Sequence, residues 1–235
     1  MSPALIIDTD NQLHEIRKQD LPQHPAVLRF AAKIISYIFH PVFVPVYVVA
    51  FLLYVHPYIF AGYTGNNKII VIAQAFMMLT FFPLVSVLLL KALKFIDSIY
   101  LYTQKDRIIP FIACMTWYFW LWYVWNNMGK AGGADMPPET VQLALAIFIT
   151  TIIGLMVNIK IKISLHAISM GVMITFMLLL GFSQTLHFGA YLSVALLITG
   201  LVCTSRFIVS DHTQLEIYAG LAVGAISMLI AYLLG

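Results

Sequence analysis

Long apolar runs, separated by short polar segments, fill the chain from residue 41 to its end. An α-helix needs about 20 apolar residues to cross the hydrocarbon core of a bilayer, and each run approaches that length. The pattern therefore predicts seven membrane-spanning helices. Their expected ranges are about 41–62, 69–90, 108–126, 140–158, 165–185, 187–205 and 214–234.

The first forty residues follow a different pattern. Residues 1–24 are polar and lack helical periodicity, so we expect a short polar tail outside the bilayer. Farther along, Arg29 and Lys33 are one helical turn apart among apolar neighbours, which favours an interfacial helix from 25 to 39. His40 and Pro41 then break it. The chain is thus expected to consist of the tail and a single transmembrane domain, residues 25–235.

Composition supports this architecture. Hydrophobic residues make up 61% of the 235 positions and charged residues only 10%, whereas a soluble domain carries about 25% charged residues. So few charges cannot cover a water-facing surface. We predict an all-α fold, a polytopic transmembrane helix bundle of about six to seven spans plus the N-terminal interfacial helix. The net charge of +3 is small and gives no reason to expect a nucleic-acid partner.

Basic residues are distributed unevenly between the two sides of the predicted bundle. The side that holds the N-terminus carries eleven Lys and Arg residues, and the other side carries two. Because cytoplasmic segments are enriched in Lys and Arg, we expect the N-terminus to be cytoplasmic, in a bacterial inner membrane. The eleven are Arg17, Lys18, Arg29, Lys33, Lys91, Lys94, Lys105, Arg107, Lys160, Lys162 and Arg206, and the two are Lys68 and Lys130.

Charged and ionisable side chains gather between the last two predicted spans. Desolvating an ion at the bilayer centre costs at least about 2.5 kcal/mol, so a charge close to a span needs a reason. On a helix, His212 and Glu216 share a face, and the carboxylate can hold one imidazole nitrogen while the other stays free to attack. Arg206 can grip a phosphate through two parallel hydrogen bonds. Together these residues predict a phosphoryl site.

Two further polar clusters are expected on the same membrane face. One precedes the fifth span and contains Lys160, Lys162, Ser164 and His166. The other, from Lys105 to Pro110 and including Arg107, opens the third span. Three basic clusters on one face suit the binding of an anionic headgroup.

The cluster between the last two predicted spans, from Ser205 to Glu216, resembles a motif of the type 2 phosphatidic acid phosphatase superfamily of membrane lipid phosphatases. The third motif of that family is Ser-Arg, five residues, His, three residues and Asp. Here Ser205 and Arg206 are followed by five residues, His212, three residues and Glu216, with Glu in place of Asp.

The other two motifs of the family are matched in part. In its second motif, Pro-Ser-Gly-His, this chain keeps Ser164 and His166 but lacks the Pro and the Gly. In its first motif, Lys, six residues, Arg-Pro, Arg107 corresponds to the Arg, the Pro comes only at 110, and Tyr100 occupies the Lys position. The resemblance covers residues 100–220.

This resemblance implies a role for each matched residue. His212 would be the nucleophile that forms a phosphohistidine, Glu216 would orient it, and His166 would protonate the leaving alcohol. No metal or other cofactor is implied. The expected phosphate-binding residues are Arg206, Arg107, Ser164 and Ser205, together with Lys105, Lys160 and Lys162 as further cations. The substrate would be a membrane lipid phosphate or an isoprenyl phosphate.

Other interpretations of these residues stay open. A catalytically degenerate member would bind an anionic lipid without cleaving it. A small transporter is a further alternative, although ionisable residues would then be expected in the middle of several spans, and these are nearly absent. Lys160 and Lys162 are also typical topology anchors at a membrane face. A Ser-Arg pair and a His-x-x-x-Glu pair near helix ends also occur as ordinary interfacial caps.

Overall fold

The computed structural model describes residues 5–7, 13–15, 24–101, 103–132, 134–183, 188–209 and 212–235. Two short strands near the N-terminus, β1 (Leu5–Ile7) and β2 (Leu13–Glu15), pair in antiparallel orientation. Most of the predicted polar tail lies outside the described residues, including Arg17 and Lys18. So does the predicted boundary between the fifth and sixth spans.

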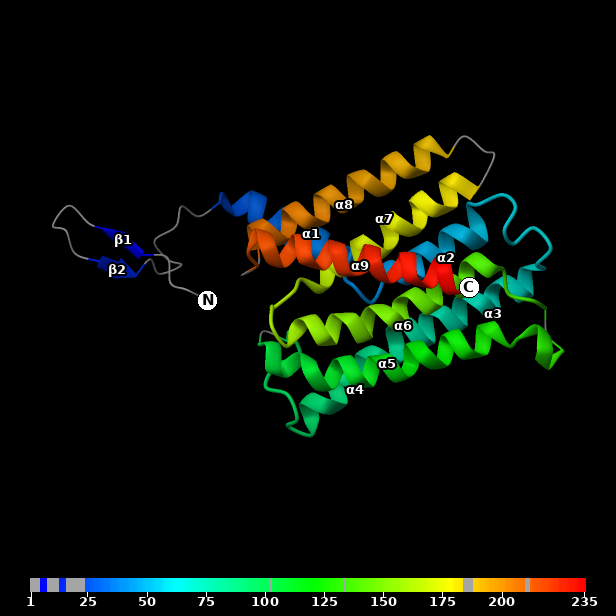
Figure 1. The fold of residues 1–235 in the computed structure, drawn as a ribbon, viewed down its shortest axis with the longest axis horizontal. Helices are drawn as coiled ribbons and strands as arrows, with labels where there is room; N and C mark the ends of the chain where they lie inside the picture. Colours follow the sequence, from blue (N-terminus) through cyan, green and yellow to red (C-terminus); the bar gives the residue numbers. More distant parts are fainter. Residues whose placement is uncertain are drawn as a thin grey trace.

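The other elements of the described chain are helices that run side by side in a bundle (Figure 1). In chain order they are α1 (Ala26–Ile38), α2 (Val44–Tyr54), α3 (Gly65–Phe76), the π turn η2 (Met77–Phe81), α4 (Phe82–Ala92), α5 (Gln104–Asn126), the short 3-10 helix η3 (Gly129–Ala131), α6 (Pro138–Asn158), α7 (Leu165–Ser183), α8 (Gly189–Val209) and α9 (Gln214–Leu234).

The second predicted span contains a proline but remains one continuous helix, Gly65–Ala92, made of α3, η2 and α4. The ring of Pro83 lacks an N–H and crowds the preceding turn, which would break a regular α-helix. The π turn lies just before it, where the N–H of Phe82 donates to Met77 O, five residues earlier. This wider turn accommodates the proline without ending the helix.

Six helices of the described chain are long and apolar enough to cross a membrane: Gly65–Ala92, α5, α6, α7, α8 and α9. They correspond to six of the seven predicted spans. The first predicted span, 41–62, instead contains α2, whose 11 residues extend only about 16 Å, about half of the hydrocarbon thickness. Pro57 explains the early end, because a proline disfavours helical geometry in the residue before it, here His56.

The segment from α1 to α2 nevertheless runs from one end of the bundle to the other. His40, between the two helices, packs against His166 at the start of α7. His56, after α2, packs against Phe188 at the opposite end. α1 lies along α8, where it buries Ala32 and Ser36, and its first turns extend past the end of the bundle (Figure 1).

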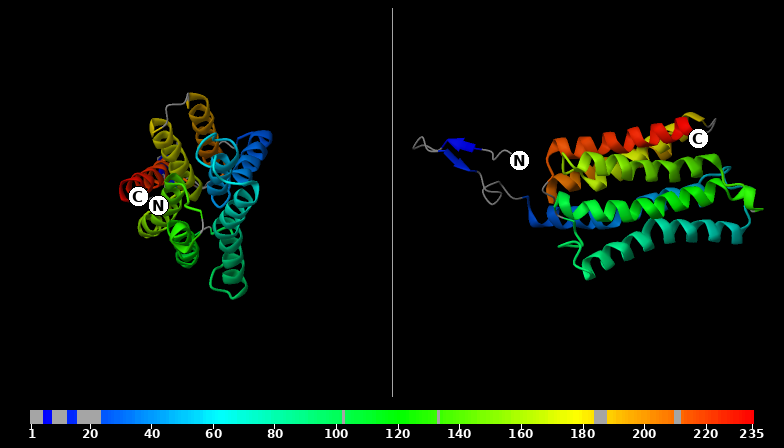
Figure 2. Two further views of the ribbon diagram at one scale, coloured as in Figure 1. Left: turned by 90° about the vertical axis from the view of Figure 1, so that its right-hand side faces the viewer. Right: turned by 60° about the horizontal axis from the view of Figure 1, so that its bottom comes forward.

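Close helix packing fixes the geometry of the bundle around α9, which contacts both α6 and α7 (Figure 2). Glycines on α7 and α9 let the two backbones touch. A Cβ added at Gly224 would collide with the carbonyl oxygen of Ile168, and one at Gly171 would collide with that of Leu221. The starts of α7 and α9, which carry candidate site residues, are therefore held at a defined separation.

The outer surface of the bundle is apolar. Large hydrophobic side chains such as Leu88, Ile112, Leu197 and Leu233 are between 51% and 82% exposed. A soluble protein rarely exposes so much contiguous apolar surface, whereas lipid chains cover it without cost. The chain is an integral membrane protein with an all-α transmembrane bundle.

Candidate functional site

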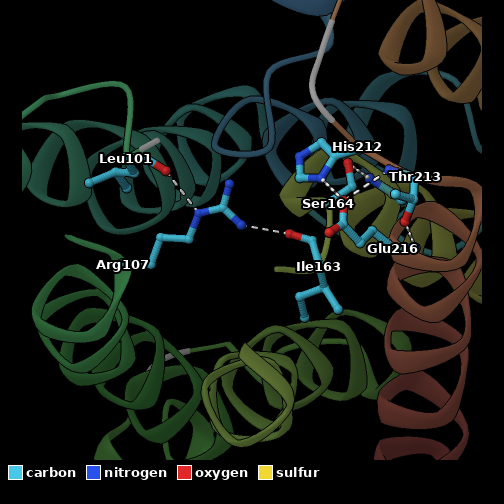
Figure 3. Close-up of polar contacts among 8 residues, drawn as sticks. Leu101, Arg107, Ile163, Ser164, His212, Thr213 and Glu216 are labelled. Carbon is cyan, nitrogen blue, oxygen red and sulfur yellow. Dashed lines mark hydrogen bonds and ion pairs between the residues drawn. The ribbon is translucent and has the colours of Figure 1, made fainter. Parts of the chain in front are cut away.

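The residues predicted to carry chemistry lie at one end of the bundle. The start of α5, the start of α7, the end of α8 and the start of α9 all reach this end, at the left of Figure 1. We call Arg107, His166, Arg206, His212 and Glu216 the polar cluster. Figure 3 shows Arg107 and the His212–Glu216 pair at the junction of these elements.

His212 and Glu216 form a hydrogen-bonded pair, with His212 Nδ1 3.1 Å from Glu216 Oε2. A carboxylate accepts hydrogen bonds, so in the neutral imidazole Nδ1 carries the hydrogen and Nε2 keeps its lone pair. The two side chains are only 5% and 9% exposed. A shielded imidazole with one nitrogen held by a carboxylate is suited to act as a nucleophile or a base.

The local sequence explains how this pair forms. Thr213 caps α9 by accepting the N–H of Glu216 at 3.3 Å, and Glu216 Oε2 accepts the N–H of Thr213 at 2.9 Å. This is a capping box, typical of Thr-x-x-Glu before an apolar helix. The sequence predicted that His212 and Glu216 share a helical face, but His212 precedes the cap residue and lies outside the helix. The same carboxylate oxygen therefore caps α9 and holds His212.

Electrostatics at the cluster favour a neutral His212. Burial, the largest cause, lowers the pKa of His212 to about 4, although its hydrogen bond to Glu216 acts in the opposite direction. The positive charges of Arg107 and Arg206 add to the lowering. At neutral pH the imidazole is thus uncharged and its Nε2 lone pair is available.

Arg107 connects α5 with the segment that precedes α7. Its Nε donates to Leu101 O at 2.9 Å and its Nη1 donates to Ile163 O at 2.7 Å (Figure 3). The side chain is buried, at 5% exposure, and the charge of Glu216 stabilises it. Two of the five guanidinium N–H groups are engaged in these bonds, so Arg107 supports the backbone of the site as well as contributing its charge.

Arg206, in the last turn of α8, is the electrostatic centre of the cluster. It is close enough to interact with His40, His166 and His212, and with Arg107. Two arginines near one another repel unless an anion lies between them or close by, and Glu216 is the carboxylate of the cluster.

The two predicted phosphate-binding serines are buried and engaged within the protein. Ser164 Oγ accepts the N–H of Ala167 at 3.4 Å at the start of α7, and Ser164 N donates to Glu216 O at 3.2 Å. Ser205 Oγ donates to Leu201 O at 2.7 Å, one turn back in α8. Both serines therefore fix helix ends around the cluster.

His166 is anchored by a residue that the sequence analysis did not single out. Its Nε2 is 3.0 Å from the backbone oxygen of Ser36, in α1. A carbonyl oxygen can only accept, so Nε2 carries the hydrogen and Nδ1 is the second position at which His166 binds a proton. A proton delivered by His166 would therefore come from Nδ1 of the imidazolium.

The predicted lysines differ from the arginines in their surroundings. Lys105 and Lys160 are exposed and Lys162 is half-buried, so these cations lie at the periphery. Within the described residues, no three His, Cys, Asp or Glu side chains are grouped as metal ligands would be.

His40 joins the cluster although the sequence analysis did not include it. Its ring packs edge-on against His166 with 5.5 Å between centroids. The signal that could have found it is the helix break at His40 and Pro41, which turns the ring inward between α1 and α2.

An apolar groove leads towards the cluster. It lies between α1 and α8 and has a volume of about 400 Å³. Small residues such as Ala31, Ala32 and Gly200 leave room between the helices, and the lining reaches Thr204 and Ser205, next to Arg206.

In comparisons with protein-family models, with curated proteins and with solved structures, nothing matches this chain.

Proposed function

We propose that this chain is a membrane-embedded phosphatase or phosphotransferase that acts on a lipid or isoprenyl phosphate through a phosphohistidine intermediate. The observation that carries the proposal is the His212–Glu216 pair, in which the carboxylate holds Nδ1 and leaves the Nε2 lone pair available beside two arginines. The motif resemblance adds weight, and we propose that the chain is a divergent member of the type 2 phosphatidic acid phosphatase superfamily.

The chemistry would proceed in two steps. His212 Nε2 attacks phosphorus, the bond from phosphorus to the leaving oxygen breaks, and the alcohol departs with a proton from His166. Water, or a second alcohol in a transferase, then gives a proton to neutral His166 and attacks the phosphohistidine, which restores His212. Arg107 and Arg206 stabilise the negative charge on the equatorial oxygens in both steps.

The groove between α1 and α8 supports an amphiphilic substrate. A hydrocarbon chain in the groove could place its headgroup beside Arg206, since the lining includes Thr204 and Ser205, directly before Arg206, and Ile208, directly after Phe207. Each methylene removed from water contributes about 0.8 kcal/mol for a soluble amphiphile. We further propose that the polar cluster faces the cytoplasm, because the described Lys and Arg residues are concentrated at its end of the bundle.

The direct test is phosphate release by the purified protein from phosphatidate, phosphatidylglycerophosphate and isoprenyl phosphates. The variant His212→Ala should lose at least about 10³-fold in kcat/KM. His24→Ala, at an exposed histidine before α1, serves as the matched control and should keep full activity. Release that persists in folded His212→Ala would rule out the phosphohistidine.

A second candidate function is binding of an anionic lipid without cleavage. It is favoured by one observation: Arg107 and Ser164, expected to hold phosphate, already have partners within the protein. In that case the protein would bind phosphatidate-containing vesicles more tightly than phosphatidylcholine vesicles and release no phosphate from them. Any His212-dependent release would exclude this function.

A further inference from the structure

His40 occupies a fixed position next to the polar cluster. α1 ends at Ile38, and the carbonyl oxygen of His40 accepts the N–H groups of Phe43 at 2.8 Å and Val44 at 3.3 Å. These bonds start α2 and hold the His40 backbone in place. The break between the two helices thus has a defined geometry, with the imidazole directed at the end of the bundle that carries His166.

The packing of the His40 ring leaves one of its nitrogens without a hydrogen-bond partner among the described residues. It lies between Phe43, at 6.2 Å between centroids, and His166, at 5.5 Å. Its Nδ1 is buried and has no hydrogen-bond partner among the described residues. Buried polar atoms in folded proteins nearly always have a partner, and an exception calls for an explanation such as a bound ligand.

The charge state of His40 suits the binding of an anion beside two arginines. Burial is the main cause that lowers the pKa of His40, and the charge of Arg206 lowers it further. A neutral imidazole still provides one N–H donor. It can therefore contribute a hydrogen bond to an anion without adding a third positive charge next to Arg206 and Arg107.

We propose that His40 is a further ligand of the phosphate group, donating a ring N–H to a phosphate oxygen of the bound amphiphile. This inference rests on the proposed function for its ligand class, because it places His40 at the same phosphate site as Arg206. It assigns a binding role to the break between α1 and α2, which lies far outside the three motif regions in the sequence.

The test measures binding without turnover. The probe is hexadecylphosphonate, whose carbon–phosphorus bond resists hydrolysis, and its Kd is measured by native mass spectrometry of the full chain in detergent. A hydrogen bond to a charged group predicts roughly 10- to 100-fold weaker binding in His40→Phe and His40→Ala. His40→Gln keeps an N–H donor and should lose less than His40→Phe.

The matched control is His56→Gln. Like His40, His56 has a buried ring nitrogen with no partner among the described residues, but it lies at the opposite end of the bundle, near Glu139. Its substitution should leave the Kd of the phosphonate unchanged. Thermal unfolding of each variant shows whether a loss of binding reflects a loss of fold, and His40→Gln provides the milder change if His40→Phe does not fold.

The outcomes separate this inference from the proposed function. If wild type releases phosphate and folded His40 variants bind the phosphonate as tightly as wild type, the role of His40 is refuted and the phosphatase stands. If wild type releases none but binds the phosphonate in a His40-dependent manner, the role of His40 is supported and catalysis is refuted. A wild-type protein that does not bind the phosphonate overturns the role of His40.

Discussion

The double use of the Glu216 carboxylate leads to a prediction that separates stability from catalysis. One oxygen of Glu216 accepts the N–H of Thr213 at 2.9 Å and lies 3.1 Å from Nδ1 of His212. Glu216→Ala removes both bonds. Thr213→Val removes only the bond from Glu216 N to the threonine hydroxyl, 3.3 Å long, and leaves the bond to His212 intact.

The two substitutions remove the same cap but should have different effects on the charge balance and on the reaction. Loss of a helix cap costs about 1 kcal/mol, so Thr213→Val should unfold about 2–4 °C below wild type in detergent. Glu216→Ala should unfold at a lower temperature still, because it also removes the carboxylate whose charge stabilises buried Arg107. A hydrogen bond to a charged group contributes about 1.5–3 kcal/mol. Glu216→Ala should therefore lower kcat/KM roughly 10- to 150-fold, whereas Thr213→Val should change it less than about threefold.

The pKa of His212 provides an independent measurement. The hydrogen bond and the charge of Glu216 both raise that pKa, so Glu216→Ala should lower it below its wild-type value. NMR of histidine-labelled protein can follow the titration. Equal losses of kcat/KM in Thr213→Val and Glu216→Ala would refute the orienting role, since the carboxylate would then matter only as a cap.

Four further predictions follow from the same geometry. Gly224→Ala places a methyl group against the carbonyl oxygen of Ile168 and should destabilise the fold by about 1–3 kcal/mol. In the control Gly200→Ala the added Cβ meets nothing within 4 Å, so its unfolding temperature should equal that of wild type. The pKa of folded His212 is about 4, and that of an unfolded histidine is about 6.5. The contribution of His212 to stability is therefore complete above about pH 6.5 and is lost as the pH falls towards 4. His212→Asn should weaken this pH dependence of the unfolding temperature, and an unchanged profile would contradict a lowered pKa of His212. Gly200→Trp fills the groove and should raise KM for a long-chain phosphate but not for a short-chain one, and equal effects on both would argue against a chain in the groove. With Cys114 and Cys203 replaced by Ala, Lys105→Cys should react with an impermeant maleimide only from the cytoplasmic side and Lys130→Cys only from the other side; the reverse pattern would refute the orientation.

Six of the seven predicted spans could be recognised from the sequence because uninterrupted apolar runs have one stable form in a bilayer. Every backbone N–H and C=O group must be paired there, and a helix pairs them within one segment. The helix of the first predicted span is shorter than expected for a local reason, since His40-Pro41 and Pro57 restrict helix formation to the 11 residues of α2. Pro83 had the opposite outcome, because a single π turn absorbed it.

The candidate site was predictable where its residues are close in sequence. The spacing of His212 and Glu216 indicated a pair, although the Thr213 cap places His212 outside the helix. Ser36 and His40 lie far from His166 in the sequence, and only the packing of α1 and α2 brings them together. The bonds from Arg107 to Leu101 and Ile163 likewise use backbone oxygens, which have no signature in an amino-acid pattern.

The phosphoryl group on His212 is the central claim, and trapping it is the most direct test. The purified protein is mixed with its lipid phosphate substrate, quenched in alkali, in which phosphohistidine persists, and digested for mass spectrometry. The expected product is a peptide that carries one phosphoryl group on His212, and this peptide should be absent from His212→Asn. Phosphate release with no phosphorylated His212 at any time during turnover, or phosphorylation of His166 instead, would contradict the central claim.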